Sequence, residues 1–466
     1  MSENKYFDRR HFLRDATAGL GHIALLSMLS DDGSAHAARP VLVPKAKRVI
    51  QIFACGGVSH IDSFDYKPDL IRLDGQECNK KFDTFFDNPG RLMKSPFEWL
   101  PNKQTGHLIS SLFPYLREQA HEITWLHSMK AKSANHTPAT FQMNSGFTIN
   151  GFPCMGAWLS YGLGSLNENL PTFVVLPDSR GLPAGGAINW TSGFLPATHQ
   201  GTGFQTKGAA VNNLQRPDSV SAAERQASLA LMHTFNTDFQ IKHPDESGIS
   251  ARIHAYELAA KMQLTIPDVV RIDTEPAHIR ALYGLDDPST ADFGRNCLLA
   301  RRLSEKGVRF VQLYHGGAFG SPRINWDAHE GIVENHTTQA KSMDKPVAAL
   351  IQDLKQRGML DDTLIIWTTE FGRTPITQGI GATGRDHHPF AYTCWMAGAG
   401  LKPGIRYGAS DDIGYDTVTS PVTVYDFHAT VLRLLGIDHT KLTYYHNGIK
   451  RRLTDVHGDV VRGILA

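Results

Sequence analysis

The sequence predicts an α/β protein whose mostly parallel central sheet carries helices on both faces. Its clearest unit is a helix that leads directly into a strand. Apolar residues between Val347 and Leu354 recur at i, i+3, i+4 and i+7, the pattern of one buried helix face, and Gly358 then ends the helix. The run that follows, 363–368, is apolar throughout its centre, as in a strand buried on both sides. Strands that alternate with helices in this way favour a parallel sheet.

The rest of the chain continues this alternation and contains no internal repeat. Apolar runs predict further strands at 49–54, 123–127, 172–176, 308–314 and 392–397. Helical patterns occupy 222–282, 296–306 and 424–435. The stretch 178–220 is rich in Gly, Pro, Thr and Asn, so we expect a loop-rich insertion there. We expect residues 39–466 to form one large domain.

The first 38 residues have the features of a twin-arginine signal peptide. The segment 8–14 reads DRRHFLR, which fits the twin-arginine pattern. A weakly apolar stretch, 16–29, follows, and Ala35-His36-Ala37 offers a small-x-small cleavage site. We therefore expect export to the periplasm or out of the cell. The alternative is a chance arginine pair before an ordinary amphipathic helix.

Charge and composition argue against nucleic acids and membranes as partners. Lys and Arg total 47 and Asp and Glu total 46, so the formal charge is +1 and there is no basic field. No later segment has the length and apolarity of a transmembrane helix, so no stable membrane insertion is expected. The five Cys show no CxxC spacing, which argues against a disulfide framework or a Cys-based zinc site. The oligomeric state stays open.

Histidine and carboxylate residues gather directly after the predicted strands. In an open α/β sheet, ligands bind beyond the carboxyl ends of the strands, so these positions are the candidates for a site. They are His60, Asp62, Asp65, Asn135, His136, His315, Asp327, His329, Glu370, Arg373, Asp386, His387 and His388. Imidazole and carboxylate groups bind divalent cations such as Zn or Mn, so we expect one of these metals as the cofactor.

Two pairs carry most of this metal hypothesis, and each has a structural alternative. Asp327 and His329 fit either one metal ion or an Asp–His hydrogen bond at the surface. His387 and His388 are adjacent and point in different directions, so we expect one metal ligand from this pair and prefer His388. The alternative for this second pair is a polar loop that ends at Pro389.

The other candidates also have two interpretations. Glu370 and Arg373 suit a salt bridge at the strand end, or a metal ligand and a bidentate grip on sulfate or phosphate. His136 is either satisfied by a backbone carbonyl or serves as a metal ligand or general base. His60 and Asp62 either order a loop or join the metal ligands.

Several long motifs resemble one bacterial family. They are GGVSHIDSFDYKP at 56–68, WDAH at 326–329, TEFGRTP at 369–375, GRDHHP at 384–389 and the C-terminal stretch 426–458. They are similar to the DUF1501 family, whose members often carry twin-arginine signals and are grouped with alkaline phosphatases and sulfatases. The resemblance implies an alkaline phosphatase-like fold, metal ions and a nucleophile at a helix N-terminus.

The chain departs from the superfamily pattern at the positions that would carry this chemistry. Glu370 stands where the superfamily has a ligand Asp, and Phe371 stands where it has a ligand His. His136 occupies the position of the nucleophile. Asp327 and His329 are two residues apart instead of four. These changes put a two-metal mechanism in doubt.

Two functions follow from this resemblance. The first is an exported, metal-dependent hydrolase of a phosphate or sulfate ester, with a small molecule or a polysaccharide as the substrate. In it, His136 and Arg373 would be catalytic. The metal ligands would be drawn from Asp327, His329, His388, His387, Glu370, Asp62 and His60. The second is a non-catalytic secreted protein that binds a metal or a glycan on the same fold.

Replacing both Arg9 and Arg10 by Lys should leave the protein in the cytoplasm, because the arginine pair is what the export machinery reads. Cell fractionation and immunoblotting of the wild type and the double variant measure this. Export of the double variant at the wild-type level would show that the pair is not an export signal.

Overall fold

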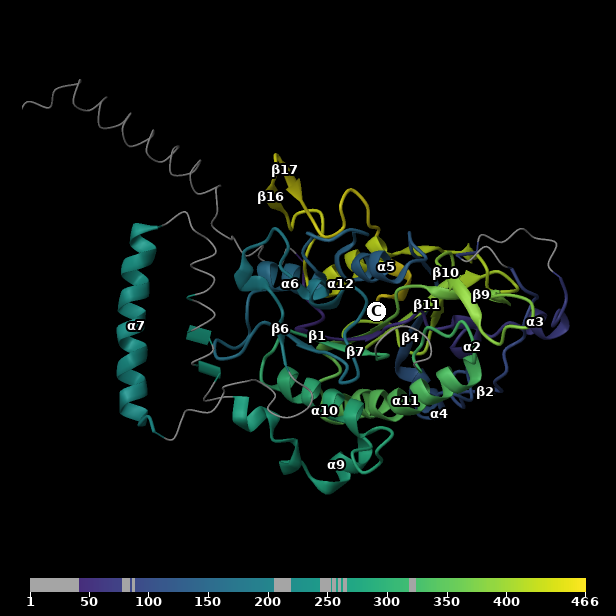
Figure 1. The fold of residues 1–466 in the computed structure, drawn as a ribbon, viewed down its shortest axis with the longest axis horizontal. Coiled ribbons are helices and arrows are strands. Elements are labelled where there is room, and N and C mark those ends of the chain that lie inside the picture. Colours follow the sequence, from purple (N-terminus) through teal and green to yellow (C-terminus); the bar gives the residue numbers. More distant parts are fainter. Residues whose placement is uncertain are drawn as a thin grey trace, which may run out of the picture.

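A nine-stranded sheet forms the centre of the molecule (Figure 1). The structure is a computed structural model and describes residues 42–77, 84–85, 89–204, 219–243, 253, 257–258, 261–262, 266–317 and 324–466. The predicted signal peptide, 1–38, lies outside the described residues, as does part of the predicted loop-rich insertion. Within 178–204 the structure has two short 3-10 helices and one two-residue strand, so this part of the insertion is largely irregular.

The sheet is mostly parallel, as predicted. Its strands run in the order β12-β4-β11-β8-β1-β7-β5-β6, and β15 also pairs with β4. Only β11 runs antiparallel to its neighbours, β4 and β8. The bounds are β1 Arg48–Ala54, β4 Ile123–Lys130, β5 Phe173–Leu176, β6 Thr202–Gly203, β7 Phe310–His315, β8 Thr363–Thr368, β11 Tyr392–Ala397, β12 Arg406–Tyr407 and β15 Val422–Thr423.

Four small two-stranded sheets lie outside the central one. Their strands are β2 Trp99–Pro101 with β3 Leu108–Ser110, β9 Gly372–Thr377 with β10 Arg385–His388, β13 Ala409–Ser410 with β14 Thr417–Thr419, and β16 Tyr444–His446 with β17 Ile449–Arg451. The β9–β10 pair follows directly after β8 in the chain, at the edge of the sheet where the polar motifs gather.

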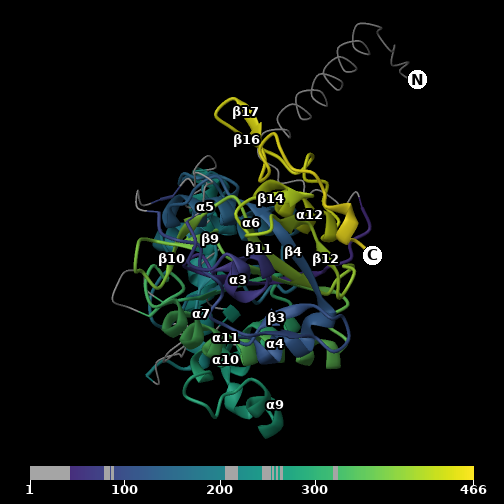
Figure 2. The same ribbon diagram turned by 90° about the vertical axis from the view of Figure 1, so that its right-hand side faces the viewer.

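Helices cover both faces of the sheet. Figures 1 and 2 show α4, α10 and α11 on one face and α5, α6 and α12 on the other. The bounds are α2 His60–Ser63, α3 Pro68–Arg72, α4 Pro114–Gln119, α5 His136–Ser145, α6 Met155–Leu163, α7 Ala222–Lys242, α9 Ala277–Leu282, α10 Ala291–Glu305, α11 Ile332–Gln356 and α12 Val424–Leu434. The three-layer α/β architecture expected from the sequence is confirmed.

Helix α11 is longer than the sequence pattern predicts. The apolar periodicity begins at Val347, directly after Pro346, whereas the helix begins at Ile332. Proline lacks an N–H and disfavours helix in the residue before it, yet Pro346 lies inside the helix. Tertiary packing overrides that local preference, because the first half of α11 also buries side chains such as Ala340 and Met343.

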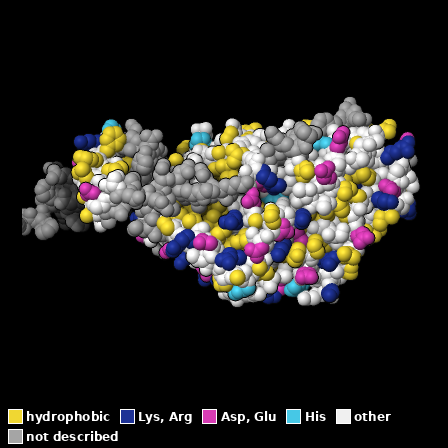
Figure 3. Space-filling model, turned by 60° about the horizontal axis from the view of Figure 1, so that its bottom comes forward, with side chains coloured by type: hydrophobic (Ala, Val, Ile, Leu, Met, Phe, Trp, Pro, Cys, Tyr) yellow, Lys and Arg dark blue, Asp and Glu magenta, His cyan; other side chains and the backbone are white. Residues whose placement is uncertain are grey.

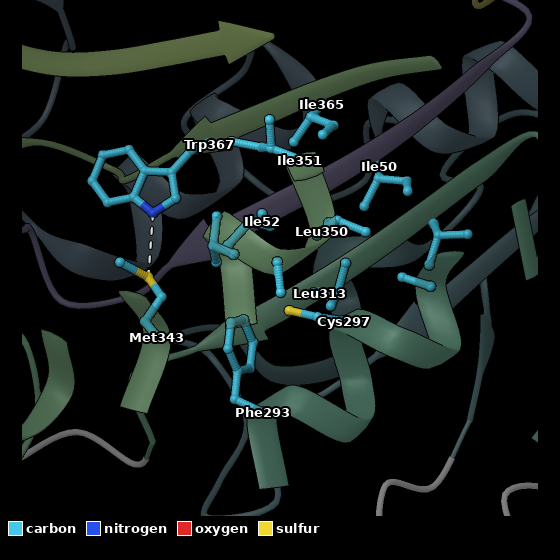
Figure 4. Close-up of a cluster of buried hydrophobic side chains, with 14 of the residues drawn as sticks. Ile50, Ile52, Phe293, Cys297, Leu313, Met343, Leu350, Ile351, Ile365 and Trp367 are labelled. Carbon is cyan, nitrogen blue, oxygen red and sulfur yellow. Dashed lines mark hydrogen bonds between the residues drawn. The ribbon is translucent and has the colours of Figure 1, made fainter. Parts of the chain in front are cut away.

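Strand β1 shows why its sequence is apolar at nearly every position. Ile50 and Ile52 belong to one buried cluster, while Val49 and Phe53 point to a second cluster on the opposite face. Side chains alternate across a strand, so a strand between two helical layers must be apolar on both sides. Figure 4 shows part of the first cluster, where β1, β7, β8, α10 and α11 meet and the Trp367 indole N–H donates to the Met343 sulfur.

The described residues show no apolar helix of membrane-spanning length. On the face that carries α10 and α11, positive and negative side chains are interspersed (Figure 3), in keeping with the near-zero net charge. Cys55, Cys154, Cys297 and Cys394 are buried free thiols, so no disulfide links these four.

Truncating Leu350 to Ala should lower the free energy of unfolding by about 2–5 kcal/mol, because the change leaves a cavity between α11 and the sheet. Leu350 is fully buried, and Leu166, which is 44% exposed, provides the matched control. We expect Leu166→Ala to change stability by about 0.5 kcal/mol or less. Urea unfolding of the full-length proteins measures both. Equal effects of the two substitutions would contradict the assignment of Leu350 to the core.

Candidate metal centre

Six of the residues predicted from the sequence meet at one edge of the sheet. Strands β1, β4, β7 and β8 point the same way, so their carboxyl ends share this edge. The six side chains come from the segments that follow these strands or from the β9–β10 pair. They are His136, Asp327, His329, Glu370, Arg373 and His387.

The Asp327 carboxylate is the centre of this group. Its Oδ1 lies 3.2 Å from Nε2 of His136, 2.8 Å from Nε2 of His329 and 3.1 Å from Nε2 of His387. Asn325 fixes the local backbone, since its side-chain oxygen accepts from the Asp327 N–H at 2.9 Å. Three imidazole nitrogens therefore converge on one carboxylate oxygen.

Arg373 holds Asp327 in place. Its Nη2 donates to Asp327 Oδ1 at 2.7 Å and also to the Gly56 carbonyl. Its Nε donates to the Gly57 carbonyl at 2.8 Å, and its Nη1 donates to the Arg385 carbonyl at 3.1 Å. The side chain is fully buried. Because protein groups already occupy these donors, the geometry does not support the expected grip of Arg373 on a substrate anion. These contacts position Asp327.

Glu370 orients His136. Its Oε1 accepts from His136 Nδ1 at 2.7 Å and from the Gly56 N–H at 2.8 Å. A carboxylate only accepts, so Nδ1 of His136 carries the proton and Nε2 faces Asp327. His387 is oriented in the same way, because its Nδ1 donates to the Ala134 carbonyl at 2.7 Å. A hydrogen bond from the ring nitrogen that does not face the metal is characteristic of metal-binding histidines. The structure shows Glu370 in an orienting contact with His136, and Glu370 does not belong to the group of mutually close ligand atoms.

Two glycines after β1 allow the Asp327 backbone and the Phe371 ring to pack closely against the end of that strand. Gly56 and Gly57 follow β1 with φ of +122° and +66°, in the region that favours glycine. A Cβ on Gly56 would lie 2.7 Å from the Asp327 nitrogen, and one on Gly57 would lie 2.4 Å from the Phe371 ring. Sequence reasoning missed that the carbonyls of these two glycines accept hydrogen bonds from Arg373.

The electrostatics of the cluster favour a cation. Burial raises the pKa of Asp327, but the Arg373 guanidinium and hydrogen bonds from the three imidazoles outweigh it and hold that pKa far below its usual range. Burial lowers the pKa of His136, but hydrogen bonds to Asp327 and Glu370 raise it above its ordinary value overall. Burial lowers the pKa of His387 well below its ordinary value, although the hydrogen bond to Asp327 opposes this shift. Asp327 therefore stays ionised and can face a cation.

The donor set fits a metal ion. One ligand atom each from His136, Asp327 and His387 lies within 4.8 Å of the others. Tetrahedral ligands about 2.0–2.2 Å from a central ion lie about 3.3–3.6 Å apart, and the Asp327 Oδ1 to Nε2 distances of 3.2 Å for His136 and 3.1 Å for His387 are close to that spacing. His329 Nε2 also contacts Asp327 Oδ1, but His329 is not part of this mutually close group. Two imidazoles and one carboxylate suit zinc or another borderline divalent metal.

Two phenylalanine rings pack against the histidines of the centre. Phe371 lies 4.9 Å from the His136 ring and 4.7 Å from the His387 ring, measured between centroids. Phe85 lies 4.9 Å from the His387 ring. Phe371, which stands where the superfamily has a ligand His, therefore packs against two imidazoles instead of offering a ligand atom.

Three expected ligands lie outside the cluster. His60 Nε2 bonds the Gly414 carbonyl at 2.9 Å, and His388 Nε2 bonds the Tyr415 carbonyl. Asp62 forms a buried ion pair with Arg385, with Oδ2 2.7 Å from Nε. These contacts favour the loop-ordering alternative for His60 and Asp62, and they make His387, not the preferred His388, the member of the pair that faces Asp327.

The register of β9 and β10 explains the choice between the two histidines. His387 pairs with Arg373 and His388 pairs with Gly372. Residues directly opposite in a strand pair share a face, so His387 and Arg373 reach Asp327 together. On the other face, a Cβ on Gly372 would lie 2.6 Å from Nδ1 of His60, so glycine makes room for that ring.

Comparison with known proteins identifies the family. The sequence model of a family described as "Protein of unknown function (DUF1501)" matches residues 46–465. The chain belongs to the DUF1501 family. The resemblance seen in the sequence motifs is therefore confirmed. A search of curated proteins gave no match.

Solved structures give distant similarities to this DUF1501 chain. Ps i-CgsB in complex with a neocarrahexaose is 11% identical, with a TM-score of 0.37 over 84% of this chain and 72% of that one. The PsFucS1 sulfatase from Pseudoalteromonas sp. is 13% identical, with a TM-score of 0.36 over 87% and 74%. The alkaline phosphatase from the Antarctic bacterium TAB5 is 12% identical, with a TM-score of 0.34 over 77% and 92%. At these TM-scores the similarities carry no conclusion about activity.

Replacing His387 by Ala should remove tightly bound divalent metal, because it deletes a donor beside Asp327, whereas His388→Ala should retain it. Elemental analysis of full-length protein, folded with zinc or manganese and then dialysed, measures the metal per chain. Circular dichroism confirms that each variant is folded. Metal loss from folded His388→Ala with retention in His387→Ala would reverse this assignment.

Proposed function

We propose that this protein is a divalent-metal-dependent hydrolase of phosphate or sulfate esters, with one metal ion held by Asp327, His136 and His387 and with His329 beside Asp327. The observation that supports this proposal is the convergence of three imidazole Nε2 atoms on one carboxylate oxygen, within 2.8–3.2 Å. An ordinary surface hydrogen bond needs one imidazole, not three. Zinc and manganese are the metals we expect.

The chain's own groups would have distinct tasks at this centre. Glu370 keeps the proton of His136 on Nδ1, so Nε2 is presented toward Asp327. Arg373 keeps Asp327 ionised and fixed. A bound divalent cation would polarise the ester oxygen and lower the pKa of a water molecule. His136 would serve either as a ligand or as the base that takes a proton from water on Nε2.

The ester class rests on the sequence resemblance. The superfamily that the motifs resemble contains phosphatases, phosphodiesterases and sulfatases, and its substrates include small molecules and polysaccharides. The twin-arginine pattern at 8–14 adds the proposal that the enzyme acts outside the cytoplasm. Export of folded protein is compatible with loading the metal inside the cell.

One observation favours the second function, a secreted protein that binds metal or glycan without catalysis. Arg373, which could bind an ester anion, and Cys55, which could attack an ester, are not available for these tasks. The Arg373 guanidinium bonds protein carbonyls and Asp327. Burial raises the pKa of the Cys55 thiol well above its ordinary value, so it is a poor nucleophile.

Metal-loaded protein should hydrolyse at least one of 4-nitrophenyl phosphate, bis(4-nitrophenyl) phosphate and 4-nitrophenyl sulfate. His136→Ala should lower the rate about a hundredfold or more, the scale of a lost general base or ligand. His233, an exposed histidine on α7, provides the control, and His233→Ala should retain the wild-type rate. Nitrophenol release gives the hydrolysis rate of the wild type and of both variants, and the metal content of each is determined in parallel.

The stereochemistry of a chiral phosphorothioate ester distinguishes two routes. Direct attack by water inverts the configuration, whereas a covalent intermediate gives net retention. We expect inversion, because His136 replaces the usual nucleophile. Retention would refute direct attack. If the metal-loaded wild type turns over none of the substrates, and His136→Ala changes neither metal content nor ligand binding, the hydrolase proposal fails.

A further inference from the structure

A second cavity lies beside β4 and β12, and none of the metal-centre residues lines it. Its volume is about 380 Å³, within the range of about 300–1,000 Å³ that is typical of small-ligand sites. We call it the Arg406 cavity. Its lining residues are Phe64, Asp65, Tyr66, His107, Leu108, His127, Arg406, Gly408 and Ala409.

Two neutral imidazoles form the floor of the Arg406 cavity. The His107 and His127 rings meet edge to face, with centroids 5.3 Å apart. Burial and the neighbouring His127 lower the pKa of His107 to about 3. Burial lowers the pKa of His127 to about 4, helped by Lys67 and Arg406 although Asp65 opposes it. Both rings are therefore neutral near pH 7.

These imidazoles have hydrogen-bonding capacity that the described protein groups do not use. His107 donates to the Phe64 carbonyl, and its Nδ1 is buried without a partner among the described residues. His127 Nδ1 bonds the Thr393 hydroxyl at 3.1 Å, which is its one hydrogen bond within the described part of the chain. Unsatisfied buried polar atoms are costly, so a hydroxyl-bearing ligand would stabilise this floor.

One positive charge at the cavity is uncompensated. Asp65 is paired with Lys67 at 3.1 Å and accepts from the Ser410 hydroxyl at 2.5 Å, so these two charges cancel. Arg406 is exposed, and the described residues give it no ion-pair partner. A guanidinium in this state suits a carboxylate or sulfate group, which it binds through two parallel hydrogen bonds.

The walls are aromatic. Phe64 and Tyr66 line the cavity, and the Tyr66 ring is supported by Trp99 at a centroid distance of 5.3 Å. Aromatic rings offer flat apolar surface to the C–H face of a sugar ring, while neutral imidazoles exchange hydrogen bonds with hydroxyls. A free inorganic anion would use Arg406 but neither of these other features.

We propose that the Arg406 cavity binds one acidic saccharide unit, with the carboxylate or sulfate group on Arg406, a hydroxyl on His127 and the sugar ring against Tyr66. The three contacts come from three segments that meet only in the folded chain, β12, β4 and the loop after α2. The proposal does not depend on hydrolysis at the metal centre, because Asp327 and its partners do not line the cavity.

Isothermal titration calorimetry of the full-length protein with D-glucuronate and with galactose 6-sulfate tests this site. Both should bind more tightly than glucose, galactose or inorganic sulfate. Arg406→Gln should weaken binding of the acidic sugars about tenfold to a hundredfold, since it removes a charge-assisted pair. Arg295→Gln, at an exposed arginine on α10, is the matched control and should bind like the wild type.

Asp327→Asn separates this proposal from the hydrolase proposal. It should leave the affinity for acidic sugars unchanged even where it abolishes hydrolysis. Three results would overturn the proposal: no heat of binding with either acidic sugar at millimolar concentration, equal affinity of wild type and Arg406→Gln, or inorganic sulfate binding as tightly as galactose 6-sulfate. The last result would mean that the cavity recognises a free anion, not a sugar.

Discussion

The buried ion pair between Arg373 and Asp327 is the interaction on which the rest of the site depends. A buried charge is tolerated only when it is paired and its remaining hydrogen bonds are satisfied. Arg373 meets this condition by bonding Asp327 together with the carbonyls of Gly56, Gly57 and Arg385. It thereby ties the end of β1, the β9–β10 pair and the segment around Asp327 into one rigid unit.

The positions of the histidines follow from that unit. Once Asp327 is fixed, the His136, His329 and His387 rings converge on a carboxylate that stays ionised. Their outer nitrogens are held by unrelated parts of the chain, as Glu370 holds His136 and the Ala134 carbonyl holds His387. These Nδ1 hydrogen bonds hold the rings in place before a cation binds, so they favour a pre-organised site.

A second buried Asp–Arg pair also involves the β9–β10 pair, and it links parts of the scaffold to one another. Asp62 and Arg385 pair within the protein interior, and Ser59 also donates to the same carboxylate. Both partners are fully buried, whereas Asp327 retains 13% of its side-chain surface. The same residue types therefore form a scaffold when sealed and a candidate metal centre when slightly open.

Local sequence was enough to predict the six main strands of the sheet, because a strand between two helical layers must be apolar on both faces. It was also enough to place Asp327, His329, His136 and His387 among the candidates, because polar residues that follow such strands meet at one edge, but it preferred His388 to His387. Its local nature explains why the apolar pattern at 347–354 covers only the second half of α11, whose first half is held by long-range packing.

The sequence by itself therefore determined the fold class, the family and the residue types of the site, since all three are written in local periodicity and contiguous motifs. Only the tertiary structure decided which of those residues act together. Whether His387 or His388 faces Asp327 depends on the pairing of β10 with β9, and a shift of one residue would exchange them. The Arg373 donors are occupied by carbonyls more than 300 residues away in sequence. Such contacts arise from packing between distant segments, which no local pattern encodes.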